Sequence, residues 1–368
     1  MKKLFRKATR SDLHTFSQWQ LIWFKFRRHK LAVLSLWVLA ALYVVTILGP
    51  FFSPYPMNER TRDIYRQPQA IHFCGEGGCQ LRPFVYAMVG ERDPETLQKL
   101  YKEDRSQKLE VYFFERSWEY RLLGLLPVDL HFFGVREGVI HLFGTDNLGR
   151  DLLSRVIMGA QVSLSVGVVG LLFSFAVGCI MGGISGYAGG LPDMIIQRLI
   201  EFLRAIPTIP LWLSLSAAMP PEWPPVRVYF GITIILGTIS WTGLARVVRG
   251  RLIQVRSEDF VIAASLAGAS EPRIVVRHML PAMTSHLIVS LTLSIPGMIL
   301  GETALSYLGL GLRPPVVSWG VLLQEAQKVD TLILHPWILI PAYFVVLFVL
   351  AYNALGDGMR DAADPYIR

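Results

Sequence analysis

Few side chains in this sequence have the types and spacing that catalysis requires. The sequence contains no Gly-x-x-x-x-Gly-Lys-Ser/Thr nucleotide loop, no His-Glu-x-x-His zinc motif and no Gly-x-Ser-x-Gly nucleophile turn. Its three cysteines are too few for a disulfide framework or a four-cysteine zinc site. We therefore expect no catalytic residue, no metal site and no cofactor, and we expect that the chain is not an enzyme.

Cys74 and Cys79 are a candidate disulfide pair. They bracket the segment Gly75-Glu76-Gly77-Gly78, whose flexible glycines allow the two sulfur atoms to meet. The bond needs an oxidising compartment, so two unpaired thiols are the alternative. Cys179 lies in an apolar run, where a cysteine packs like a small hydrophobic residue.

The composition is that of a membrane protein. Of the 368 residues, 52% are hydrophobic and 17% are charged, whereas an ordinary soluble domain has about a quarter charged residues. This excludes a soluble enzyme and a disordered chain. The net charge of +8 alone would fit a nucleic-acid binder. Apolar runs long enough to cross a bilayer indicate a membrane protein rather than a nucleic-acid binder. We therefore expect lipid and no nucleic acid as a partner.

Six membrane-spanning helices are predicted from runs without charge. The first covers 31–53. It is longer than the apolar region of a signal peptide and lacks a small-residue cleavage site, so we interpret it as a retained anchor. The other spans lie within 156–192, 205–221, 228–245, 279–301 and 331–356.

Helix-breaking residues occur in two of these runs. Pro207 and Pro210 lie in the short third run, and Pro296-Gly297 interrupts the fifth. Broken helices are tolerated where the backbone lines a cavity, as in transporters, so we expect helix breaks near a pore. A plain kink in a packed bundle is the alternative. Glu302, near the outer end of its run, is expected to be solvated or locally paired.

The first 30 residues carry nine Lys/Arg and one acid. Trp19, Ile22, Trp23 and Phe26 recur at helical spacing, which predicts an amphipathic helix on the cytoplasmic membrane surface. A basic flank of the first span is the alternative. With this segment inside, the segments 1–30, 188–204, 246–283 and 357–368 are all cytoplasmic. Together they hold 19 Lys/Arg against 9 Asp/Glu, as the positive-inside rule requires.

Residues 54–140 form a long polar insert between the first two spans. Under the same topology it lies outside the membrane, on the periplasmic side. Within it, we expect 91–121 to be partly helical and 111–114 to form a strand. The predicted fold is therefore an all-α polytopic membrane protein, in which a five-helix core over 141–368 follows the insert.

The cytoplasmic loop 246–283 contains two short predicted helices. Acids at 258–259 favour the start of the first helix, and Gly268 is suited to end it. Glu271-Pro272 opens the second helix, which has basic residues near its end. Elsewhere, glycines at 178, 182, 186 and 190 recur every four residues, which predicts a close-packing helix face.

Motifs in this loop resemble those of a known family. Ala263-Ala264, Gly268 and Leu280-Pro281 resemble the "EAA" loop of permease subunits of bacterial ABC importers, although Ile262 replaces the usual glutamate and His278 the usual isoleucine. Asp259-Phe260 and Arg277-His278 resemble the dipeptide/oligopeptide (DppC/OppC-like) branch of the binding-protein-dependent transport system inner-membrane family. Segments with the same resemblance lie at 141–151, 302–311, 314–320 and 355–365. The insert is longer than we expect for that branch.

The resemblance implies a permease with a type I ABC importer core in the bacterial inner membrane, with both termini cytoplasmic. Its implied partners are a second, homologous permease, two ABC ATPase subunits, and a periplasmic or lipid-anchored solute-binding protein that touches the insert and the loop 306–334. The implied coupling segment is 257–281. The residues expected to face the ATPase are Asp259, Phe260, Ala263, Ala264, Gly268, Arg273 and Arg277.

Peptides, meaning di- or oligopeptides, are the solutes that the branch implies. Oligosaccharides, opines and nickel complexes are alternatives within the same machinery. An ion-coupled secondary transporter is a distant alternative, because only Glu302 and His286 offer titratable groups in or beside the spans.

Overall fold

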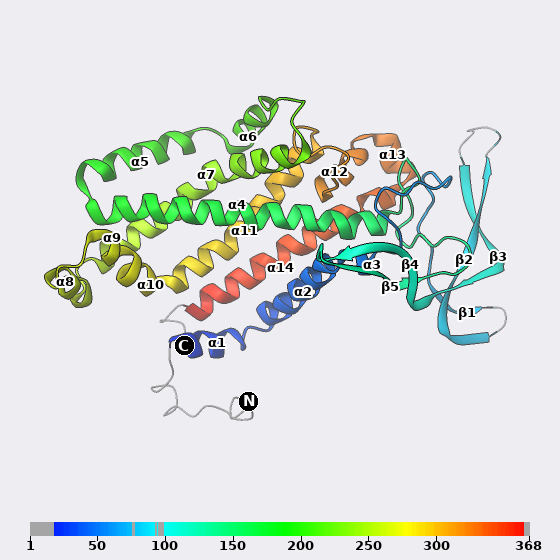
Figure 1. The fold of residues 1–368 in the computed structure, drawn as a ribbon, viewed down its shortest axis with the longest axis horizontal. Coiled ribbons are helices and arrows are strands. Elements are labelled where there is room, and N and C mark those ends of the chain that lie inside the picture. Colours follow the sequence, from blue (N-terminus) through cyan, green and yellow to red (C-terminus); the bar gives the residue numbers. More distant parts are fainter. Residues whose placement is uncertain (1–17, 76–77, 93, 95–98, 364–368) are drawn as a thin grey trace.

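A long helical bundle carries a small β region at one end (Figure 1). The computed structural model describes residues 18–75, 78–92, 94 and 99–363. In this part of the chain, five helices are long and apolar enough to cross a membrane. They are α2 (Lys30–Ile47), α4 (Leu152–Ala188), α7 (Pro225–Val255), α11 (Thr284–Tyr307) and the helical stretch Pro336–Ala363, most of which is α14 (Ile340–Ala363). The chain is thus mostly helical with several apolar helices, as predicted.

The third predicted span, 205–221, is not a single straight helix. Two helices, α5 (Gly190–Ala205) and α6 (Thr208–Ala217), meet there at 85°. Pro207 lies at the bend with an extended ψ of 129°, and Pro210 lies in the first turn of α6. With ten residues, α6 has a length of only about 15 Å, half of a bilayer core.

The predicted break at Pro296-Gly297 is wrong. The helix α11 continues through both residues from Thr284 to Tyr307. Pro296 is buried in the packed bundle, and membrane helices tolerate such a proline when neighbouring groups satisfy the freed backbone.

The glycine face of α4 packs against α7. A β-carbon added at Gly182 would lie 2.6 Å from the carbonyl oxygen of Ala245, and one at Gly178 would lie 2.9 Å from Leu244. A β-carbon at Gly186 would lie equally close to Leu252, whereas one at Gly190, the first residue of α5, would meet none of the described residues within 4 Å. Three of the four glycines therefore permit close contact of two long helices, and the fourth lies beyond the helix.

The polar insert folds into strands, so the all-α prediction is wrong for this region. It contains β1 (His72–Gly75), β2 (Gly78–Arg92), β3 (Lys99–Glu110), β4 (Tyr112–Leu122) and β5 (Leu126–Gly134). The first three form one antiparallel sheet, and β4 pairs with β5 in a separate hairpin. The described part of 91–121 is strand and turn rather than helix, while the strand expected at 111–114 is confirmed from Tyr112 onward.

A disulfide joins Cys74 to Cys79 across the β1–β2 turn. The hydrophobic core of the insert is small, with Val85, Leu109, Val111 and Ile140 buried together. Because so little apolar surface is available, covalent closure of the turn adds to the order of this region.

The motif 141–151 caps α4. Asp151 is the N-cap residue, and its carboxylate accepts a hydrogen bond from the Ser154 amide at 2.7 Å. His141 Nδ1 lies 2.8 Å from the same carboxylate, and both side chains are buried. Asp146 pairs with Arg150 at 2.7 Å and with Arg155 at 3.4 Å. These charged residues therefore position the start of the long helix.

Glu302 is fully buried rather than solvated. Its carboxylate accepts hydrogen bonds from Ser163 Oγ on α4 at 3.0 Å and from Ser306 Oγ at 2.8 Å. Ser163 Oγ also accepts the amide hydrogen of Trp319, at the start of α12 (Trp319–Leu323). The predicted local pairing is thus present, and it joins three elements at one end of the bundle.

We expect Glu302→Ala to destabilise the folded protein by about 2–4 kcal/mol, because two buried hydroxyls lose their acceptor. Glu302→Gln keeps one carbonyl acceptor and should lose less. Thermal unfolding of both variants in detergent measures the difference. Equal melting temperatures for the alanine variant and the unchanged protein would contradict this role.

Candidate functional site

The 257–281 loop lies at the opposite end of the bundle from the strands (Figure 1). It contains α8 (Asp259–Leu266), α9 (Glu271–Ile274), a π-helical turn (Val275–Met279) and α10 (Leu280–Ala282), and it leads into α11. Pro281 has no amide hydrogen to donate, and such residues favour local departures from α-helical bonding.

Gly268 ends α8 with a complete Schellman motif. Its φ is +77°, a conformation that favours glycine. The Gly268 amide donates to the Ser265 carbonyl at 3.0 Å, and the Ala269 amide donates to the Ala264 carbonyl at 3.1 Å. The predicted helix end is therefore confirmed in its hydrogen-bonding detail. A β-carbon on Gly268 would meet no atom of the described residues within 4 Å, so the glycine faces open space in this part of the chain.

Apolar packing fixes the inner side of the loop. Val261, Ile274 and Met279 are buried in one cluster with Val248 and Leu252 of α7. The Cys179 side chain of α4 also packs against this cluster, as the sequence predicts. Leu287 of α11 belongs to the same cluster. The long helices α4, α7 and α11 therefore hold the loop firmly against the bundle.

An ion pair holds the adjoining helices together. Arg249 of α7 donates from Nε and Nη2 to the two carboxylate oxygens of Asp193 on α5, both at 2.6 Å. The Asp193 carboxylate also accepts a hydrogen bond from Ser185 of α4. Such bidentate geometry fixes the three helix ends more firmly than a single contact would.

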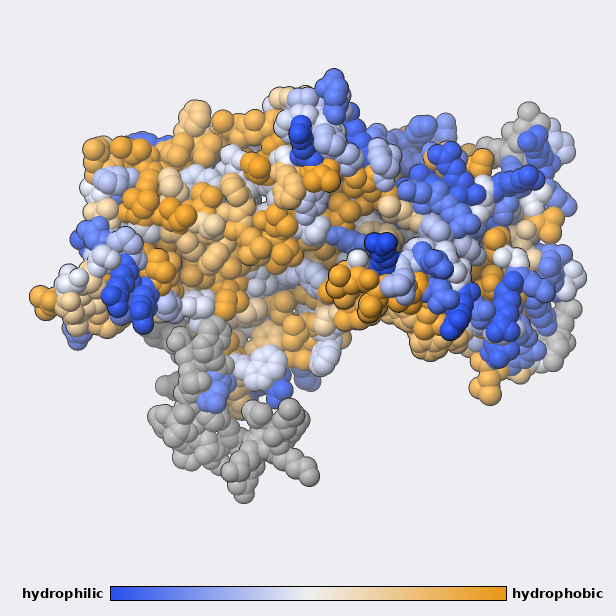
Figure 2. Space-filling model, viewed as in Figure 1, coloured by the Kyte–Doolittle hydropathy of each residue, from blue (hydrophilic) through white to orange (hydrophobic). Residues whose placement is uncertain are grey.

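The outer side of the loop combines exposed charges with exposed apolar groups. Figure 2 shows hydrophilic and hydrophobic residues side by side at this end of the molecule. Leu266 is 85% exposed, and Phe260 and Ile262 are exposed as well. Asp259, Arg273 and Arg277 are exposed, and none of them forms an ion pair within the described residues. An exposed apolar group ringed by unpaired charges is typical of a protein interface.

Six of the seven residues predicted to face a partner are exposed here. They are Asp259, Phe260, Ala263, Gly268, Arg273 and Arg277. Ala264 differs, because it is half-buried and packs against the inner cluster. Sequence reasoning missed Ile262 and Leu266, because α8 is apolar on nearly all sides and such a pattern does not show which side chains are exposed.

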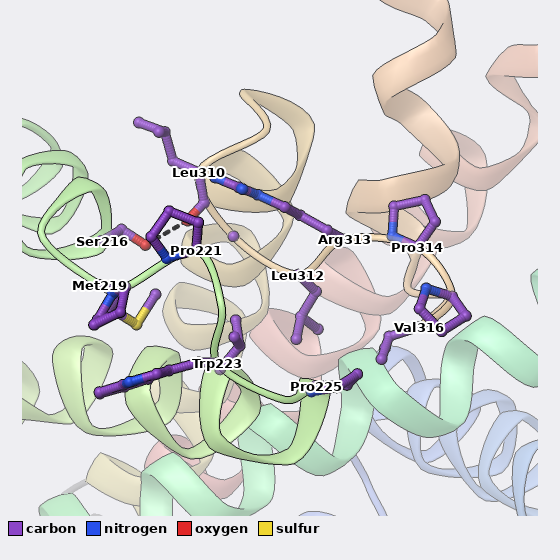
Figure 3. A pocket seen from close by; sticks show the side chains of 14 residues that line it. Ser216, Met219, Pro221, Trp223, Pro225, Leu310, Leu312, Arg313, Pro314 and Val316 are labelled. Carbon is purple, nitrogen blue, oxygen red and sulfur yellow. Dashed lines mark hydrogen bonds between the residues drawn. The ribbon is translucent and has the colours of Figure 1, made fainter.

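A cavity of about 240 Å³ lies between the α6–α7 connection and the segment that follows α11 (Figure 3). Ser216 Oγ donates to the Leu310 carbonyl at 2.6 Å and thereby joins the two walls. Five of the fourteen lining residues are prolines, and Arg313 lies beside Pro314, where its guanidinium donates to the Gly309 carbonyl at 3.2 Å. Proline has no backbone N–H and a fixed φ, so these walls offer few backbone donors and change shape little.

The chain matches two family models. One describes the binding-protein-dependent transport system inner membrane component and matches residues 174–368. The other describes the N-terminal TM domain of oligopeptide transport permease C and matches residues 17–70.

Curated relatives give the same result over greater length. The dipeptide transport system permease protein DppC of Bacillus subtilis is 30% identical over 366 residues, which cover 99% of this chain and 90% of that protein. This alignment includes the insert. The oligopeptide transport system permease protein OppC of Haemophilus influenzae is 40% identical over 61% of this chain and 70% of that protein. Among solved structures, an inward-facing form of the MetNI methionine ABC transporter covers 55% of this chain and 95% of that chain, with 17% identity and a TM-score of 0.41.

Proposed function

We infer that this chain is the membrane-spanning permease subunit of an ATP-driven importer of peptides. It belongs to the family of binding-protein-dependent transport system inner-membrane components. The observation that carries this proposal is the 257–281 loop, which is packed firmly on the bundle on one side and exposed on the other. The sequence holds no nucleotide-binding motif, so the energy for transport comes from partner ATPases.

The proposed topology has six spans with both termini in the cytoplasm and a type I importer core. The bent pair α5–α6 supplies the third span, which the count of up to six candidate spans allows. The charge distribution supports this orientation, because the segments placed inside hold 19 Lys/Arg and 9 Asp/Glu. The strands and the 257–281 loop lie at opposite ends of the bundle, which supports a periplasmic insert if the loop is cytoplasmic (Figure 1).

The amino-terminal segment also supports a cytoplasmic N-terminus. The described helix α1 (Gln18–Phe26) packs Ile22 and Phe26 against Ala362 near the end of α14, while Trp23 is exposed. An exposed tryptophan beside basic residues suits the cytoplasmic membrane surface. The predicted amphipathic segment also includes residues 1–17, which lie outside the described part.

Coupling proceeds, in this proposal, through the exposed side of the loop. Phe260 and Leu266 enter a groove of the ATPase, and Arg273 and Arg277 pair with acids at its rim. Because the inner side is packed onto α7 and α11, a displacement of the loop moves these helices with it. Nucleotide binding and hydrolysis would in this way switch the access of the pore.

The remaining partners follow from the same family. A second, homologous permease completes the pore, two ATPase subunits bind the two loops, and a solute-binding protein delivers the peptide. The proline-lined cavity beside Arg313 and the insert are the surfaces proposed to meet that binding protein. Peptides are the proposed solute because the relatives that match this chain include named dipeptide and oligopeptide permeases.

Co-purification tests the docking surface directly. We expect the double variant Phe260→Ser, Leu266→Ser to retain less ATPase than the unchanged chain, by at least about tenfold, since two apolar anchors are lost. Leu81→Ser serves as the matched control, because Leu81 is fully exposed at the other end of the molecule. Full ATPase recovery with the double variant would rule out the proposed docking surface.

A further inference from the structure

The turn of the β4–β5 hairpin is unusually apolar. Its sequence is Leu122-Leu123-Gly124-Leu125-Leu126, where turns normally carry Gly, Asn, Asp or Ser. Leu123, Leu125 and Leu126 are 66%, 82% and 63% exposed. Leu123 also has a φ of +51°, which is costly for a leucine. The chain thus maintains a group of leucines that nothing in its described part covers.

This hairpin turns back toward the helices, whereas the β1–β3 sheet points away from them (Figure 1). Its tip residues Arg121, Leu123 and Gly124 share a cavity of about 680 Å³ with residues of α2 and α4. The α2 residues in the cavity wall are Tyr43, Thr46 and Ile47. Figure 2 shows hydrophobic residues gathered where the strands meet the helical bundle.

The cavity shared with α2 indicates the depth of the tip. With 18 residues, α2 has a length of about 27 Å, close to the thickness of a bilayer core. Its exposed apolar side chains continue to Ile47, the last residue of the helix. The hairpin tip, which shares the cavity with Thr46 and Ile47, therefore lies at the level of the boundary between acyl chains and headgroups.

The hairpin is fixed in this position. His131 of β5 lies between two backbone carbonyls, with Nδ1 3.0 Å from Pro50 O and Nε2 2.9 Å from Trp118 O. The Phe132 ring lies 6.0 Å from Phe51 and 5.3 Å from Phe52, both in α3 (Gly49–Phe52), directly after α2. These contacts hold the strands to α3 at the end of α2, so the tip keeps a fixed depth relative to α2.

We propose that the leucine tip 122–126 inserts into the outer leaflet and anchors the insert to the membrane surface. Arg121, exposed immediately before the tip, then reaches the lipid phosphates, as cationic side chains do at an interface. The continuity of the tip with the lipid-facing side of α2 is the argument for lipid as the occupant. The inference relies on the proposed membrane placement of α2 and is independent of the solute.

Spin-label accessibility tests this proposal in the assembled importer. A nitroxide is attached at Leu125→Cys in a Cys179→Ala background, with the Cys74–Cys79 disulfide kept oxidised, and the complex is placed in phospholipid nanodiscs. Oxygen concentrates in the bilayer, and a nickel chelate stays in water. We expect the label at Leu125→Cys to be relaxed more by oxygen than by nickel. The matched label at Leu81→Cys, on the sheet that points away, should show the reverse order.

Two results would overturn the anchor. Greater relaxation by nickel at Leu125→Cys would place the tip in water. Low accessibility to both reagents would mean that protein covers it, as a second permease subunit would. Peptide uptake by the same labelled importer tests the proposed function separately, so the failure of one inference is distinguishable from the failure of the other.

Discussion

We expect the Gly268→Asp variant to reach the membrane in normal amount but to import far less peptide than the unchanged chain. Gly268 has a φ of +77°, and its α-hydrogens face open space in this chain. An aspartate there strains the end of α8 by at most about 1–2 kcal/mol, which the packed loop tolerates. In the proposed docking surface, however, the same carboxylate would lie against the ATPase without a partner. A desolvated, unpaired charge costs several kcal/mol, so uptake should fall by more than about tenfold.

Gly268→Asn is the matched control for this prediction. Asparagine adopts left-handed backbone conformations as readily as aspartate, has the same size and carries no charge. We expect it to retain much more uptake than the aspartate variant. Uptake of a labelled peptide into membrane vesicles, normalised to the amount of permease, measures both. Normal ATP-driven uptake by Gly268→Asp would refute the assignment of this loop as the coupling element.

Gly182→Ala should lower the stability of the folded chain by about 1–3 kcal/mol, although it adds one methyl group. The new carbon would lie 2.6 Å from the Ala245 carbonyl oxygen, 2.7 Å from Val248 Cβ and 3.0 Å from Ala245 Cα. Backbone atoms of α7 cannot rotate away as a side chain can, so the two helices must separate. The melting temperature in detergent should fall by several degrees.

The neighbouring residue supplies the control. A β-carbon on Gly183 meets only Val275 Cγ1, at an ordinary 3.5 Å, so Gly183→Ala should be neutral or slightly stabilising. Both variants make the same chemical change one residue apart in the same helix. If they melt at the same temperature, close packing of α4 on α7 does not explain the glycine repeat.

Local chemistry explains why much of this molecule could be predicted from its sequence. The apolar runs predict five of the spanning helices, because a helix must satisfy its own backbone in lipid. Likewise, Gly268 predicts the end of α8, since a Schellman motif depends on only a few consecutive residues. The glycine spacing predicts a packed face, although only the structure shows that α7 is the partner.

The misses depend on contacts between distant residues. The charged segment 91–121 is predicted to be partly helical, but strands form there because residues far apart in the sequence pair, as Phe84 does with Glu110. Strand propensity is weak evidence without the pairing partner. The predicted break is present at Pro207 but absent at Pro296, because surrounding helices decide whether a proline breaks a helix or only removes one of its hydrogen bonds. Leu266 was missed since exposure cannot be read from one short apolar helix.

The length of α4 has a consequence for transport. Its 37 residues extend over about 55 Å, well beyond a bilayer core. In its first half, Ser163 hydrogen-bonds Glu302; near its end, Gly182 and Gly186 lie tightly against α7 beside the 257–281 loop, the proposed docking surface for the ATPase. An importer must not be open to both sides of the membrane at the same time. In the proposed importer, rotation of this continuous helix about its middle would move its two ends in opposite directions, so that the pore closes on one side of the membrane as it opens on the other.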